Sequence, residues 1–144
     1  MTRNQTVEIN HLTVLQIQYL TELEQLEKGR GTIGAVAAKC GVKHPTVSRF
    51  FKSCIEKGYL TESLEFTDKG KKMLRWHQKV QKDVREYLER SGITEGIDDV
   101  LKGMIENIDY RRLEELTKSH MRINKEIRMQ KEQNQIRNIE ELVE

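Results

Sequence analysis

Apolar residues recur at steps of three and four along most of this chain, the spacing that places them on one face of an α-helix. A first helix is predicted over residues 10 to 28, where the stripe consists of Leu12, Leu15, Tyr19, Leu23 and Leu26. Similar stripes predict a long helix over residues 68 to 90, another after Thr94 and a short one from Asp109. The chain is therefore expected to be mainly α-helical.

Residues 33 to 57 predict two short helices joined by a tight turn. Ala37 is small enough to lie where two helices cross, and Gly41, four positions later, can adopt a positive φ in the turn. Val47 follows six positions after Gly41 and can fill the space between the helices. With Phe51, these residues form the expected core of a helix-turn-helix.

The second of these helices has two distinct faces. Pro45 fits its first position, where a missing N–H costs nothing, and an apolar stripe follows at Val47, Phe50, Phe51, Cys54 and Ile55. The other face is cationic or hydrogen-bonding, and such groups bind base edges and phosphates, so double-stranded DNA is the expected partner. A merely solvated polar face is the simpler alternative. The expected DNA-binding residues are Lys43, His44, Pro45, Thr46, Ser48, Arg49, Lys52 and Ser53.

A short hairpin is predicted next, with strands over residues 59–61 and 64–66, a bend at Glu62 and Ser63, and Thr67 capping the following helix. A hairpin in this place is typical of a winged helix-turn-helix. The expected wing is short and acidic, with no lysine or arginine before Lys69, so we expect it to contribute little to DNA binding.

Three regions follow from these patterns: a winged helix-turn-helix DNA-binding domain over residues 1–70, linking and dimerisation helices over 71–118, and a C-terminal helical extension over 119–144. The helices after the wing are more apolar than a small winged domain needs, which favours a homodimer with recognition helices about 34 Å apart. In the extension, a thin stripe indicates either a docked helix or a solvated, frayed one. Its members are Ile123, Ile127, Ile136, Ile139 and Val143.

Charge and composition narrow the class of protein. The formal net charge of the 144 residues is only +2, but residues 39 to 57 hold five basic residues and one acidic one. No apolar run approaches the length of a membrane-spanning helix and the N-terminus is polar, so we expect a cytoplasmic protein without membrane contact. The sequence has no GxSxG, P-loop or HExxH motif, so we expect no enzyme.

Two cysteines, Cys40 and Cys54, fall in the helix-turn-helix, and neither belongs to a CxxC motif or a Cys/His cluster. Packing is their expected role. A redox switch is the alternative, and it would need an exposed thiol with a lowered pKa.

Four segments, HPTVSRFFKSCIEKGYL, FTDKGKKML, VREYLERSGI and IDDVLKGMIENIDYRRLEEL, follow one another within residues 10–118. In order and spacing they resemble the diphtheria-toxin-repressor (DtxR/MntR) family of iron- and manganese-dependent regulators. The matching landmarks are the PTVS start of the recognition helix, the TxKG start of the linking helix and the LxxxGI at its end. The resemblance implies a homodimeric repressor that binds palindromic operators and responds to Mn²⁺ or Fe²⁺.

The metal ligands that this resemblance implies are largely missing. Gln16 and Gln18 stand where acids are expected in the first helix, Val80 or Gln81 where a histidine is expected, and Lys102 among aliphatic residues in the third ligand block. The remaining candidate ligands are His77, Glu106 and His11. We therefore expect no resident metal cofactor and a regulator that is metal-independent or differently triggered.

Two further functions fit the same pattern. A MarR-like regulator also places helices on both sides of a winged domain and senses small molecules between them, although that family usually has a longer, basic wing. A winged helix can also serve as a protein-interaction module without DNA binding, and the acidic wing favours that alternative. A salt-dependent gel shift distinguishes DNA binding from the interaction module.

Overall fold

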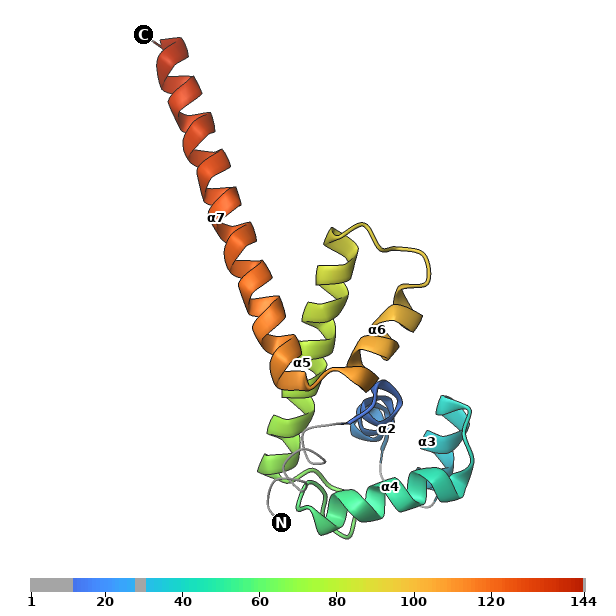
Figure 1. The fold of residues 1–144 in the computed structure, drawn as a ribbon. Coiled ribbons are helices and arrows are strands. Elements are labelled where there is room, and N and C mark those ends of the chain that lie inside the picture. Colours follow the sequence, from blue (N-terminus) through green and yellow to red (C-terminus); the bar gives the residue numbers. More distant parts are fainter. Residues whose placement is uncertain (1–11, 28–30, 144) are drawn as a thin grey trace.

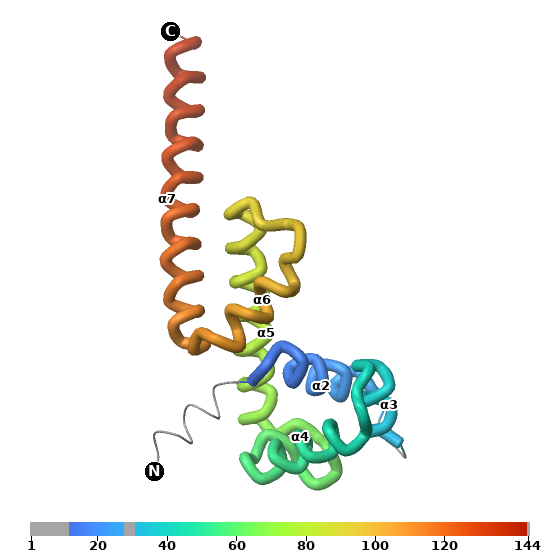
Figure 2. The backbone as a smooth tube through the Cα atoms, turned by 45° about the vertical axis from the view of Figure 1, so that its right-hand side comes forward, coloured from blue at the N-terminus to red at the C-terminus, as the bar shows by residue number. Residues whose placement is uncertain are grey.

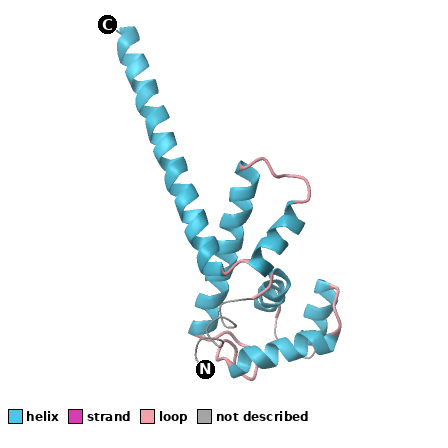
Figure 3. Cartoon of the chain, viewed as in Figure 1, coloured by secondary structure: helices cyan, strands magenta, loops and turns pink. Residues whose placement is uncertain are grey.

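The computed structural model describes residues 12–27 and 31–143, and all named elements in these ranges are helices (Figures 1 and 3). They are α2 (Val14–Gln25), α3 (Thr32–Cys40), α4 (His44–Glu56), α5 (Asp68–Arg90), α6 (Ile97–Asn107) and α7 (Tyr110–Val143). The prediction of a mainly helical chain is confirmed. No helix in the described ranges is long and apolar enough to span a membrane.

The first predicted helix is shorter than expected. It starts at Val14 because the Thr13 side chain accepts a hydrogen bond from Gln16 N while the Gln16 side chain accepts one from Thr13 N, a capping box. Leu26 has extended backbone and closes the helix. Asn10 and Lys28, the expected ends, lie outside the described residues.

One hydrophobic core joins α2, α3, α4, the loop after α4 and the first turns of α5. Leu20, Leu23, Val36 and Leu74 are fully buried in it, with Tyr59 beside them. The Gly41 turn between α3 and α4 has a φ of 68°, and its N–H closes the end of α3 on the carbonyls of Ala37 and Ala38. This core fixes α4 in a single orientation.

The predicted two-stranded wing is not formed. Leu60 and Phe66 make an isolated antiparallel bridge, and the prediction of two strands was wrong. Local bonds take up the backbone instead: Thr61 N donates to Glu65 O at 2.8 Å, and Glu65 N donates to the Thr61 hydroxyl at 3.1 Å. Leu64 adopts a φ of 63°, which folds the loop back before a strand can extend.

The start of α5 explains the spacing of Thr67 and Gly70. Thr67 caps the helix, accepting a bond from Gly70 N at 3.0 Å and donating its hydroxyl to Gly58 O at 2.6 Å. Gly70 is buried against the preceding loop, and a Cβ at this position would lie 2.0 Å from Tyr59 O. A glycine is therefore required where α5 leaves the wing loop.

A second core lies on the other half of α5, which packs against both α6 and α7. Val80, Val84 and Leu88 of α5 meet Ile105 of α6 and Leu113 of α7, and all five are buried. The apolar stripe that suggested a subunit interface on α5 is thus covered within the chain.

Helix α7 is continuous over 34 residues, so the prediction that the helix from Asp109 is short was wrong. The helix contains no glycine or proline to stop it. Its first turns pack on α5, and Figures 1 and 2 show it running past the end of α5 as a single projecting helix. The expected boundary between residues 118 and 119 falls inside this helix.

Candidate nucleic-acid interface

Helix α4 is positioned by its buried face. Val47, Phe51 and Cys54 are buried in the first core, and Phe50 and Ile55 pack along its edge. The helix starts at His44 after Lys43, so Pro45 occupies its second position and not the first. A rigid helix with one buried face leaves its opposite face fixed toward solvent.

That opposite face carries the cations that the sequence analysis selected. Pro45, Thr46, Arg49 and Lys52 are exposed, and neither Arg49 nor Lys52 forms an ion pair within the part of the chain that the structure describes. Arg49 points away from the core at the centre of the face, since it lies between the exposed Pro45 and Lys52 on the helix surface. These groups are available for an anionic partner.

The other predicted residues are less uniformly placed. Lys43 and His44 are exposed at the start of α4, whereas Ser48 and Ser53 are half-buried at the edges of the face. Glu56, the one acidic residue counted in residues 39 to 57, is exposed one turn after Lys52. Because a carboxylate repels phosphate, the first three turns of α4 are the part suited to DNA.

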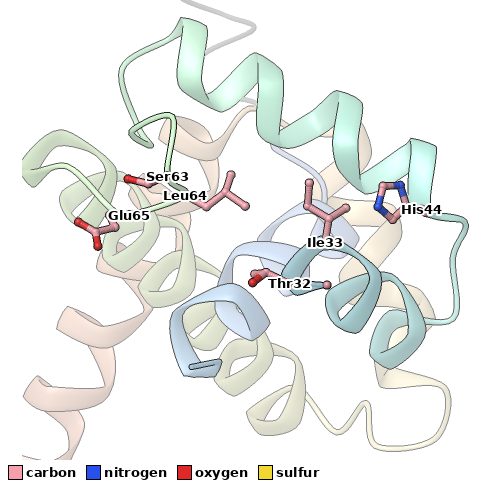
Figure 4. Close-up of a pocket in the computed structure, with 7 residues that line it drawn as sticks. Thr32, Ile33, His44, Ser63, Leu64 and Glu65 are labelled. Carbon is pink, nitrogen blue, oxygen red and sulfur yellow. The ribbon is translucent and has the colours of Figure 1, made fainter. Parts of the chain in front are cut away.

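A shallow hollow lies beside α4, between the start of α3 and the wing loop (Figure 4). His44, Ile33 and Leu64 lie along it, with Thr32 at the α3 end and Glu65 at the wing end. The sequence analysis did not identify Thr32 and Ile33 as neighbours of the face, because their approach to His44 depends on how α3 packs beside α4. The acidic rim at Glu65 makes this hollow a poor place for a phosphate.

The wing loop adds little positive charge. Glu62 and Glu65 are exposed on it. The first lysine after the loop, Lys69, donates from Nζ to Lys57 O at 3.0 Å and lies 5.2 Å from the centre of the Tyr59 ring. Its charge is held at the start of α5, so the wing loop itself adds no cation to the exposed face of α4.

Two of the three candidate metal ligands, His77 and Glu106, lie among the described residues. His77 is buried between the rings of Trp76 and Tyr110, and its Nδ1 donates to Met73 O at 2.7 Å. Glu106 is exposed on α6, and His11 lies outside the described residues. No group of three or more His, Cys, Asp or Glu side chains suited to a metal ion occurs among the residues that are described. The two rings that contact His77 are aromatic, and aromatic rings are not ligands of Mn²⁺ or Fe²⁺.

Both cysteines are free thiols. Cys54 is buried against the first core, and burial raises its pKa to about 12. Cys40 is half-buried, and burial, followed by the nearby Glu22 carboxylate, raises its pKa as well. Raised pKa values keep both groups protonated and poorly nucleophilic near neutral pH.

The fold and this face define a winged helix-turn-helix protein with a reduced wing. A family model described as wHTH-PRTase associated matches residues 11–94, more than half of the chain, and the protein belongs to that family. The match covers α2 to α5, including the whole of α4. No curated protein and no solved structure matches the chain.

Proposed function

We propose that this protein is a sequence-specific DNA-binding regulator of transcription, and not an enzyme, that reads duplex DNA with the exposed face of α4. The observation that carries the proposal is the pair Arg49 and Lys52, exposed on a rigid helix without ion-pair partners in the described residues. Arginine on such a face can bind guanine bidentately, and lysine can neutralise a phosphate. Membership of a winged helix-turn-helix family supports this use of the face.

We propose further that the protein acts in the cytoplasm as a homodimer that binds a palindromic operator. Like the diphtheria-toxin repressors, it represses the genes that this operator controls. The order of its helices supports that kinship. The aromatic enclosure of His77 supports a trigger other than bound Mn²⁺ or Fe²⁺.

Selection of DNA sites from a random pool tests the proposal, followed by gel shifts of the enriched site with and without Mn²⁺ and Fe²⁺. We expect a palindromic site whose affinity falls about a hundredfold or more between ~50 and ~200 mM salt, because several phosphate contacts release counterions. Failure to enrich any sequence, with no retardation at low salt, would refute DNA binding. Tighter binding with either metal would contradict the metal-independent part alone.

A protein-interaction module is the second candidate. Exposed Glu62 and Glu65 on the wing loop favour it, and the family description associates this kind of domain with a PRTase, the usual abbreviation for a phosphoribosyltransferase. In that case the cationic face of α4 would meet an acidic protein surface. Absence of DNA retention at every salt concentration, in a protein that is folded by circular dichroism, would favour this candidate.

A further inference from the structure

From about residue 123 to its end, α7 has apolar side chains that are exposed to solvent. Ile139 is 60% exposed and Leu142 85% exposed, and Ile123, Ile127 and Ile136 are exposed as well. The sequence analysis treated these residues as one stripe, but Ile127 and Ile136 are nine residues apart. Nine residues make about two and a half turns, so the two side chains lie on opposite sides of the helix. The five isoleucine and leucine side chains therefore do not form a single face of α7.

A groove between the end of α5 and α7 identifies that face. Its α5 side is lined by Glu86 and Arg90. Its α7 side is lined by Met121, Asn124, Lys125, Ile127 and Arg128, with Lys131 farther along. The Tyr87 ring of α5 lies 4.8 Å from the His120 ring of α7, so the two helices are in contact next to Glu86 and Met121 of the groove. Because α5 ends at Arg90, it does not cover α7 any farther (Figure 2).

The same face continues to the end of α7 with apolar side chains. Eighteen residues make about five turns of an α-helix, so Ile139, Leu142 and Val143 project on the same side as Met121, Asn124 and Lys125, respectively. Where it lines the groove, this face of α7 is mostly polar and basic, with Met121 and Ile127 as its apolar members, and near its end it is apolar. Because α5 ends at Arg90, it does not cover the apolar end of this face, where Ile139, Leu142 and Val143 are exposed.

Charge divides α7 in the same way. Residues 118–131 contain five basic residues and one acidic one, whereas residues 132–143 contain three acidic residues and one basic one. The groove cations Arg90, Arg128 and Lys131 form no ion pair within the described part of the chain. Each half of the helix thus complements the other half of an identical helix that runs in the opposite direction.

We propose that the groove receives α7 of a second copy of this chain in antiparallel orientation. When Lys131 lies opposite the partner's Glu132, Met121 faces the partner's Leu142 and Asn124 faces the partner's Ile139. Lys125 then lies within one turn of the partner's Glu140 and Glu141. The pairing is isologous, so both grooves are filled at once and the assembly closes as a dimer. This inference deepens the homodimer part of the proposed function and rests on it.

Sedimentation velocity of the full chain tests the dimer directly. We expect Ile139→Asp to raise the dimer dissociation constant by about 30-fold or more, since it places an unpaired charge in the interface. Val100→Asp is the matched control, because Val100 is an exposed apolar residue on α6, away from the groove, and it should leave the dimer intact. A wild-type chain that sediments as a monomer at all concentrations would overturn the inference.

Engineered cross-linking tests the direction of the helices. The double variant Met121→Cys, Leu142→Cys should form a covalent dimer on oxidation, because these positions lie about 31 Å apart within one helix and can bridge only between copies. The single variants should cross-link far less. Efficient cross-linking of Leu142→Cys alone would indicate a parallel pairing and refute the antiparallel one.

Exchanging the charges of facing residues tests the register of the two helices. The variant Lys131→Glu should weaken the dimer, and adding Glu132→Lys in the same chain should restore it, because the two facing positions then exchange their signs. Lack of rescue in a folded protein would count against the antiparallel register. DNA binding is measured separately by gel shift, so a monomer that still retards the selected site would refute the pairing and leave the role of α4 standing.

Discussion

The Tyr110 hydroxyl donates a 2.8 Å hydrogen bond to the carbonyl oxygen of Leu12, across 98 residues of sequence. Tyr110 is the first residue of α7 and is fully buried, with the His77 ring 4.4 Å away and Gln81 Nε2 donating to its hydroxyl at 3.1 Å. The bond therefore ties the segment before α2, in the winged domain, to the base of the projecting helix.

Tyr110→Phe should destabilise the fold by about 1–3 kcal/mol, because the ring packing is kept while the buried Leu12 carbonyl loses a donor. Urea denaturation followed by fluorescence of Trp76, the single tryptophan, measures the loss. The ring of Trp76 lies 5.6 Å from that of Tyr110, so the probe reports on the junction itself. Unchanged stability would mean that water replaces the bond and that the junction is looser than described.

Gly70→Ala should destabilise the protein by about 2 kcal/mol or more, although alanine normally favours a helix by about 1 kcal/mol over glycine. The reason is the 2.0 Å approach of the added Cβ to Tyr59 O, which is backbone and cannot rotate away. Thermal denaturation compares it with Gly103→Ala, a helical glycine with open space around its Cβ position. We expect the control to be neutral or stabilising, and equal behaviour of the two variants would contradict the close approach.

Arg49→Ala should weaken binding to the selected operator by about 1–3 kcal/mol and relax the preference at one base pair, as loss of a bidentate base contact does. Lys102→Ala is the control, since Lys102 is an exposed cation on α6, away from α4. Gel shifts on the operator and on single-base variants measure both effects. An equal loss on every sequence would make Arg49 a phosphate contact.

Reversing the charge of the wing should strengthen DNA binding if the wing lies near the backbone of the duplex. The double variant Glu62→Lys, Glu65→Lys replaces two exposed carboxylates, so it should tighten binding and steepen the dependence of log K on log salt by up to about 2. Binding isotherms at several salt concentrations give the slope. An unchanged slope would place the wing away from DNA.

Alkaline pH should destabilise the fold through two buried groups. Burial raises the pKa of Cys54 from 9.0 to about 12 and that of Tyr110 from 10.0 to about 12. The unfolded chain therefore loses these protons first, and the free energy of unfolding should fall as the pH rises from about 9 to about 12. Denaturation across this range measures the slope, which Tyr110→Phe should reduce. A flat profile above pH 9 would show that neither group is shielded in the fold.

The sequence by itself determined the features that depend on a few neighbouring residues. Gly41 turns with a positive φ between α3 and α4, Val47 is buried, and α5 spans residues 68 to 90 after the Thr67 cap, as the local pattern predicts. Each of these outcomes follows from sterics or capping within one or two turns of chain. The exposed face of α4 was predictable for the same reason, whereas its binding to DNA remains a prediction.

Tertiary structure alone decided what covers each apolar face. Helical periodicity shows that Val80 and Val84 share a face, but only the packing of α6 and α7 shows that the chain covers them itself. The wing loop closed on one bridge because side-chain and turn bonds satisfied its backbone, and Gly70 proved necessary because Tyr59 O lies against it. Periodicity shows which side of each helix is apolar. It does not show which element packs against that side, because that element is formed by residues far away in the sequence.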